Sequence, residues 1–222
     1  MQRINDYSYL FQNLPGSSKA KQVNDIQVSQ LGNKSVQSKL RAAGIDTNSA
    51  QYKAAIKEMT SHAGSMGMLT NVQAIKNIMS TYDKHGDEID PNTGLTGVFV
   101  TEETASARKR IVSIPESSRE EIFELTKKNF LESNGMGEKA GRNEIYTNLQ
   151  RKMKKNDRLA ASYTLSQYER SYAKAFVSSI KKANPGWDYG KPVPEGALDG
   201  ITRTTIEENM KLNSEKTVNY QV

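Results

Sequence analysis

The chain has 222 residues, a formal net charge of +6 and a pI near 9.3. It contains no Cys and only two His, which excludes thiol chemistry, disulfides and zinc–thiolate sites and disfavours His-dependent hydrolysis. No apolar run approaches the roughly 20 residues of a membrane-spanning helix, and the first residues lack the uninterrupted apolar stretch of a secretory signal. We therefore expect no membrane insertion and a cytoplasmic location by default, with non-classical export as the alternative.

Residues 1–33 predict an N-terminal amphipathic segment followed by a polar linker. Tyr7, Leu10 and Phe11 lie at helical spacing with Leu14, and weakly periodic polar sequence separates them from the rest of the chain. A detached apolar stripe of this kind is typical of a segment that docks into a groove of a partner protein. The alternative is that it packs back onto its own domain, because exposed apolar patches promote aggregation.

Three amphipathic helices are predicted next, over residues 35–44, 47–59 and 70–82. Each places apolar side chains at intervals of three or four residues, which is the pattern of a helix with one buried face. Asn48 or Ser49 is suited to cap the second helix, because a short polar side chain there can bind a free backbone amide.

The stretch TYDKHGDEIDPNTG, residues 81–94, carries the most specific chemical signal. An EF-hand loop needs oxygen ligands at positions 1, 3 and 5, Gly at position 6 and Glu at position 12. Asp83 and Asp87 fit positions 1 and 5, whereas His85 and Glu88 stand at positions 3 and 6. Asp83, Asp87 and Asp90 are thus candidate ligands of a structural Ca²⁺ or Mg²⁺ ion. The alternative is a polar turn whose side chains accept hydrogen bonds from nearby backbone amides.

The short runs GVFV (97–100) and RIVSI (110–114) are rich in β-forming residues. They predict a minimal two-stranded β element near residues 96–114. The alternative is a helix that opens at Thr101, because Glu102 and Glu103 would then favour a helix N-terminus.

Residues 114–135 predict the best-marked helix, because Ser117 and Ser118 are each followed three residues later by Glu, the spacing of a capping box. Another helix is predicted from Thr164 to the residue before Pro185, and Thr164 and Gln167 have the same capping-box spacing. A last short helix follows over 201–213.

A further helix is predicted over residues 142–158, in the most basic part of the chain. Between Lys139 and Arg158 there are seven basic and two acidic residues. Its apolar face lies opposite a basic face that can follow a phosphate backbone. That face is formed by Arg151, Lys154, Lys155 and Arg158. The alternative is a solvated surface, since no nucleic-acid recognition motif accompanies these charges.

Several blocks of the chain resemble a known family when they are read together. They are INDYSYLFQNL, LRAAGIDTNSAQYKAAIKEM, AIKNIMSTYDKHGDEIDPNTGL, IPESSREEIFELTKKNFLESNG and QYERSYAKAF. The chain is similar in these blocks to uncharacterised bacterial proteins of gut-type Gram-positive anaerobes, classed as a domain of unknown function. The resemblance covers most of the chain and implies no activity.

The sequence as a whole predicts an all-α fold of about six to eight helices over residues 34–212, with a tail over 213–222. The favoured function is a non-catalytic helical interaction or structural protein with a protein partner, because no paired catalytic residues stand out. Two alternatives stay open: a nucleic-acid-associated protein that uses the basic helix, and a metal- or carboxylate-dependent enzyme built on the acidic loop.

Overall fold

The computed structural model describes residues 25–26, 28–61, 68–101, 104–137 and 140–218. Over these residues the all-α, multi-helix prediction is confirmed, because helices joined by loops form the regular structure and no sheet is present. The chain divides into two compact units, Met1–Gly97 and Val98–Val222, and each has its own hydrophobic core. Within the described ranges, no helix combines the length and the apolar character needed to cross a membrane.

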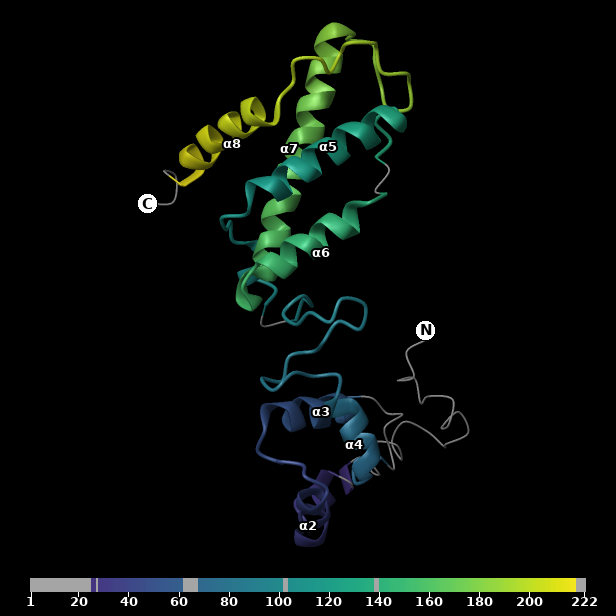
Figure 1. The fold of residues 1–222 in the computed structure, drawn as a ribbon, viewed down its shortest axis with the longest axis vertical. Coiled ribbons are helices and arrows are strands. Elements are labelled where there is room, and N and C mark those ends of the chain that lie inside the picture. Colours follow the sequence, from purple (N-terminus) through teal and green to yellow (C-terminus); the bar gives the residue numbers. More distant parts are fainter. Residues whose placement is uncertain (1–24, 27, 62–67, 102–103, 138–139, 219–222) are drawn as a thin grey trace. The chain divides into compact units, whose positions relative to one another are not determined.

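The first unit contains the three helices that the sequence predicts before the acidic loop (Figure 1). They are α2 (Lys34–Ala42), α3 (Ala50–Ser61) and α4 (Val72–Met79). Ser49, one of the two predicted caps, accepts a hydrogen bond from the Tyr52 amide at 3.1 Å. Asn71 caps α4 by accepting from the amide of Ala74 at 3.1 Å. The buried core of this unit is Leu40, Ile45, Tyr52, Ala55, Met59, Leu69, Ile75 and Ile78.

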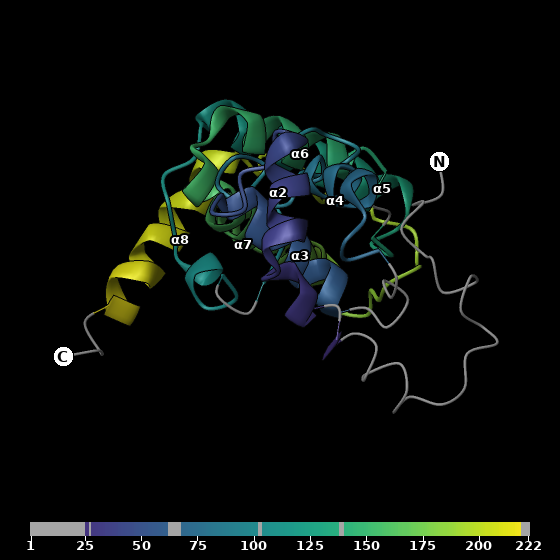
Figure 2. The ribbon, with the colours of Figure 1, turned by 90° about the horizontal axis from the view of Figure 1, so that it is seen from below.

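The second unit is organised around one long helix, α7, against which α5 and α6 lie (Figures 1 and 2). Its α-helices are α5 (Glu116–Glu132), α6 (Arg142–Lys152), α7 (Arg158–Ala183) and α8 (Arg203–Val218). Two short 3₁₀ helices precede α5 and α7, namely η3 (Ala107–Lys109) and η4 (Lys155–Asp157). With 26 residues, α7 is about 39 Å long, so one helix runs the length of this core.

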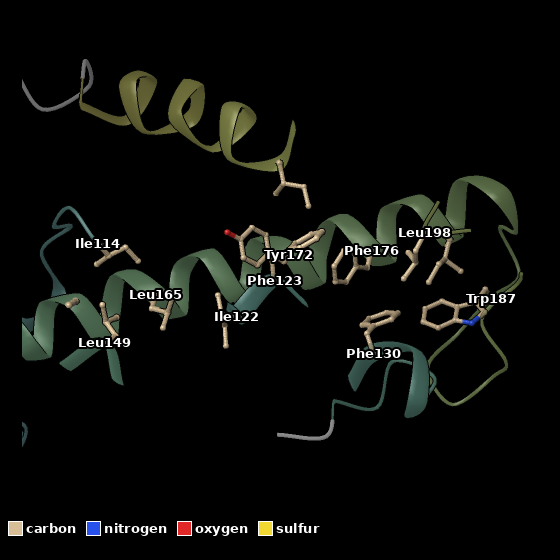
Figure 3. Close-up of a cluster of buried hydrophobic side chains, with 13 residues drawn as sticks. Ile114, Ile122, Phe123, Phe130, Leu149, Leu165, Tyr172, Phe176, Trp187 and Leu198 are labelled. Atoms are coloured by element: carbon tan, nitrogen blue, oxygen red, sulfur yellow. The ribbon is translucent and has the colours of Figure 1, made fainter. Parts of the chain in front are cut away.

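Aromatic rings fill the core along one side of α7 (Figure 3). The Phe123 ring meets the Tyr172 ring edge-on, with centroids 5.2 Å apart. The Phe130 ring lies 5.7 Å from Phe176 and stacks on Trp187 at 6.0 Å. These geometries are the favourable ones for aromatic pairs. The aromatic stripe of α7 is therefore packed inside the unit and ties α5 to the segment that holds Trp187.

The predicted pairing of residues 97–100 with 110–114 is wrong, because neither run is a strand. Isolated bridges lie elsewhere, between Tyr82 and Glu88 and between Ile89 and Thr96. The run 110–114 has no regular structure, and it packs on α7. The Val112 amide donates to the Thr164 hydroxyl at 3.1 Å, so a helix side chain provides the acceptor that a neighbouring strand would have provided.

The predicted capping boxes at the start of α5 are also wrong. The helix begins at Glu116, so Ser117 and Ser118 lie inside its first turn, and Pro115 takes the cap position without a side-chain hydrogen bond. Glu120, the expected partner of Ser117, binds Arg203 instead at 2.6 Å. The Glu120 carboxylate thus forms an ion pair with a distant residue instead of the local hydrogen bond at the helix end that the capping pattern predicts.

Both later helices are longer than predicted. α7 begins at Arg158 rather than at Thr164. Thr164 therefore lies inside the helix, where its hydroxyl donates to the carbonyl of Ala160 at 2.8 Å. α8 continues to Val218, beyond residue 213 where the tail was expected.

Candidate functional site

The acidic loop is a polar turn closed by its own aspartates. The Asp83 carboxylate accepts from the amides of His85 at 2.8 Å and Asp87 at 3.0 Å. The Asp90 carboxylate accepts from the Asn92 amide at 3.1 Å and from the Thr93 hydroxyl at 2.6 Å. These are the local bonds expected of the turn alternative.

Hydrogen bonds also hold the start of the loop against α3. The Gln51 side-chain amide on α3 donates to the carbonyls of Met79 at 2.9 Å and Tyr82 at 2.7 Å, and the Tyr82 hydroxyl donates to Glu58. Among the residues that the structure describes, no group of three or more His, Asp and Glu side chains is placed to hold a metal ion. Ion binding by Asp83, Asp87 and Asp90 stays a prediction.

The predicted basic helix over 142–158 is two helices separated by a turn. Met153 is extended, and η4 follows it before α7 begins. The four candidate residues are spread over three elements: Arg151 on α6, Lys154 and Lys155 in the turn, and Arg158 at the start of α7. Arg158 Nε donates to the carbonyl of Gln150 at 3.1 Å, which satisfies an acceptor at the C-terminal end of α6. The four residues therefore do not lie on one continuous helix, and nucleic-acid binding stays a prediction.

The candidate docking residues Tyr7, Leu10 and Phe11 lie outside the described residues.

A buried cluster of polar side chains joins α8 to α5 and α7. Glu207 on α8 is only 5% exposed. It accepts from the Tyr172 hydroxyl at 2.6 Å and from Arg203 Nη1 at 2.8 Å, and it pairs with Arg119. Burial, reinforced by the Glu207 hydrogen bond, raises the pKa of the Tyr172 phenol well above its usual range. This cluster has a structural role, because its groups all point at one another.

A second polar cluster joins α6 to α7. Arg142 Nε donates to both oxygens of Glu169 at 2.8 Å, and its Nη2 donates to the Tyr146 hydroxyl, also at 2.8 Å. The Tyr146 hydroxyl donates in turn to Glu169 at 2.8 Å. Burial and then the Glu169 charge raise the pKa of Tyr146, so its phenol stays protonated. The negative charge of Glu169 is thus offset within the protein.

A half-open cavity of about 510 Å³ lies between α5 and α7, beside this second cluster. Its apolar wall comprises Ile122, Leu125, Phe130, Ala173 and Val177, of which Figure 3 shows Ile122 and Phe130. Polar lining comes from Arg142, Glu169, Arg170 and Lys174. The volume lies within the range of about 300–1,000 Å³ that is usual for ligand sites.

The loop after α5 contributes two glycines, Gly135 and Gly137, to the lining of the cavity. Gly135 has φ +79°, and a Cβ there would come within 2.9 Å of the Trp187 ring. Only glycine lets the backbone approach the buried indole this closely. The next residue, Met136, is 69% exposed, and Tyr189, which lines the cavity, is 52% exposed. The cavity therefore has an apolar rim open to solvent.

Sequence reasoning missed this site, although signals for it were present. Arg170 and Lys174 are four residues apart on a helix whose neighbouring face is aromatic, and Arg203 and Glu207 have the same spacing. These spacings show only which side chains share a helix face. The partners Arg142 and Glu169 are 27 residues apart in the chain, and their meeting depends on how α6 packs on α7.

The second unit thus combines an all-α fold with an open cavity that is lined largely by apolar side chains. The chain belongs to the family described as "Domain of unknown function (DUF3879)", whose model matches residues 45–222. No curated protein and no solved structure matches the chain.

Proposed function

We propose that the protein is a non-catalytic helical interaction protein that binds a protein partner through the rim of the α5–α7 cavity. One observation carries this proposal: Tyr189 lines the largely apolar cavity with half of its surface exposed, and the mostly exposed Met136 lies between the lining residues Gly135 and Gly137. Neighbouring exposed apolar side chains that continue into a cavity are typical of interaction sites.

The polar groups at the cavity support binding rather than catalysis. Glu169 accepts three hydrogen bonds from Arg142 and Tyr146, so its lone pairs are committed to holding α6 on α7. The Ser166 hydroxyl donates to the carbonyl of Tyr163 at 2.6 Å, an arrangement that does not activate it as a nucleophile. For either Glu169 or Ser166 to act in catalysis, these bonds would have to be broken first.

The two alternative functions have less support than this proposal. The nucleic-acid alternative assumed one continuous basic helix, which is divided in the structure. The enzyme alternative assumed a cluster of acidic residues, of which Asp83 and Asp90 accept hydrogen bonds within the turn. We retain a bacterial source, a cytoplasmic location and a structural Ca²⁺ or Mg²⁺ ion at residues 83–94 as parts of the proposal. Titration calorimetry with CaCl₂ and MgCl₂ tests the ion; heats equal to those of an Asp83→Asn variant would overturn it.

Site-specific photo-crosslinking tests the interaction. A benzophenone amino acid replaces Tyr189 in the full chain, which is expressed in its source cells. Leu131 is the matched control position, since it is 43% exposed and apolar but does not line the cavity. We expect a discrete protein adduct from position 189 that is missing from position 131. Identical adducts from both positions, or none, would overturn the proposal, as would turnover of a small molecule by the purified chain.

A further inference from the structure

The mouth of the α5–α7 cavity carries an unbalanced positive charge. Among the described residues, the charged ones that line the cavity are three basic residues, Arg142, Arg170 and Lys174, and one acidic residue, Glu169, whose charge Arg142 offsets. Arg170 and Lys174 both line the cavity, are exposed and stand one helical turn apart. No ion pair found among the described residues includes either of them. An occupant with a carboxylate at this edge would therefore be favoured by charge complementarity.

The dimensions of the cavity suit a short helical segment. Its lining residues run from Ile122 to Phe130 on α5 and from Ser166 to Val177 on α7. At 1.5 Å per residue these stretches are about 12 Å and about 16 Å long, which corresponds to two or three turns of a helix. A half-open cavity of this length leaves one side of an occupant in water, whereas small ligands are usually enclosed over most of their surface.

We propose that the α5–α7 cavity is the docking site for an acidic amphipathic helix of a partner protein. Apolar side chains at spacings of three, four and seven residues enter between Leu125 and Val177, as in other helix-in-groove complexes. Carboxylates beside that stripe pair with Arg170 and Lys174. This inference rests on the proposed function and adds the chemistry of the partner.

The chain's own N-terminal segment lacks the complementary charge. Residues 1–14 contain one Arg and one Asp, so their side chains carry no net negative charge. The structure therefore favours a separate acidic partner over this segment, and a peptide of residues 1–14 serves as a competing probe.

A peptide selection tests whether the cavity prefers acidic amphipathic helices, and it needs no known partner. Random 16-residue peptides are displayed and selected on the full-length chain, and binders of an Ala173→Trp variant, whose cavity is filled, are discarded. We expect enriched sequences that combine Leu, Ile or Phe at helical spacing with Asp or Glu on the adjacent face. Enrichment of neutral or basic sequences, or no enrichment, would overturn the proposal, as would tighter binding of the 1–14 peptide than of any selected peptide.

Charge reversal on α7 then locates the binding site. An enriched peptide should bind the double variant Arg170→Glu/Lys174→Glu about tenfold more weakly than the native chain, since two attractive contacts become repulsive. The matched control, Lys181→Glu/Lys182→Glu, changes the net charge equally on the same helix but outside the cavity lining, and should change affinity less than about twofold. Equal losses in both variants would show general charge attraction and overturn the site.

The four exposed substitutions should leave the fold intact, which the fluorescence of buried Trp187 verifies. The crosslinking at Tyr189 distinguishes a failure of the acidic-helix proposal from a failure of the proposed function. A specific adduct at Tyr189 together with no acidic preference would refute the acidic helix alone, whereas absence of the adduct would refute the proposed function.

Discussion

Replacing Glu207 by Gln should be among the most destabilising polar substitutions in the second unit. Glu207 and its partners Arg119 and Arg203 have side chains that are 6%, 19% and 11% exposed. Removing one member of a buried ion pair costs about 3–5 kcal/mol, because the charge left behind has neither water nor a counterion. Arg203 keeps its pairs with Glu116 and Glu120, so Arg119 bears most of the loss. We expect the free energy of unfolding to fall by about 3 kcal/mol.

Trp187 provides an assay that is specific for this unit. It is the only Trp of the chain, is 2% exposed and belongs to the core that α5, α7 and α8 share. Urea unfolding followed by its fluorescence therefore reports the second unit without interference from the first. Glu208→Gln is the matched control: the same chemical change at the next residue, which is exposed, should cost less than about 0.5 kcal/mol. Equal losses in Glu207→Gln and Glu208→Gln would refute the anchoring role of the cluster.

Three further outcomes are expected. Gly86→Ala should destabilise the first unit by about 2 kcal/mol, because the φ of Gly86 is +82° and a Cβ would lie 2.9 Å from the carbonyl oxygen of Ala50. Gly94→Ala should cost only about 1 kcal/mol, because Gly94 has φ +70° but open space around it. Melts followed by far-UV circular dichroism measure both. Thr164→Val should cost about 1–3 kcal/mol in urea unfolding, because the Val112 amide loses its acceptor, whereas Thr164→Ser should be milder. Since the pKa of Tyr172 is raised in the folded state, its stabilising contribution is complete below about pH 10 and is lost above it. Unfolding free energies measured from pH 9 to 11 should therefore fall less steeply in Tyr172→Phe.

Helix existence was predictable from the sequence, whereas helix limits were not. The apolar spacing of Leu165, Tyr172 and Phe176 identifies a buried face wherever the helix begins, so α7 was found. Its start at Arg158 depends on the turn around η4, and that turn depends on the bond from Arg158 to the carbonyl of Gln150. A capping pattern assigns a side chain to the nearest helix end, but Thr164 and Glu120 are used by Val112 and Arg203 from distant parts of the chain.

The candidate site was less predictable for the same reason. A cavity forms where side chains from different helices leave a space between them. The periodicity of a single sequence shows only which side chains share a face of one helix. Conversely, the acidic loop looked chemically specific because Asp83, Asp87 and Asp90 are close in sequence. In the folded loop, Asp83 and Asp90 accept hydrogen bonds from their own neighbours. Closeness along the chain therefore indicated the turn, whereas ion binding by these residues stays a prediction.

Two neighbouring faces of α7 contribute to the core and to the proposed docking surface. Successive residues of a helix are rotated by about 100°, so Leu165, Phe176 and Ile180 share one stripe, while Ala173 and Val177 lie on the stripe beside it. The first stripe is fully buried and the second lines the cavity. The apolar face of α7 is thus wider than the contact with α5 and α6 covers, and Arg170 and Lys174 border its uncovered side. Val177 contributes to the core as well, since it packs against the buried cluster. Ala173 and Val177 nevertheless stay only partly buried, so the proposed partner would find both an apolar surface and charges at its edge.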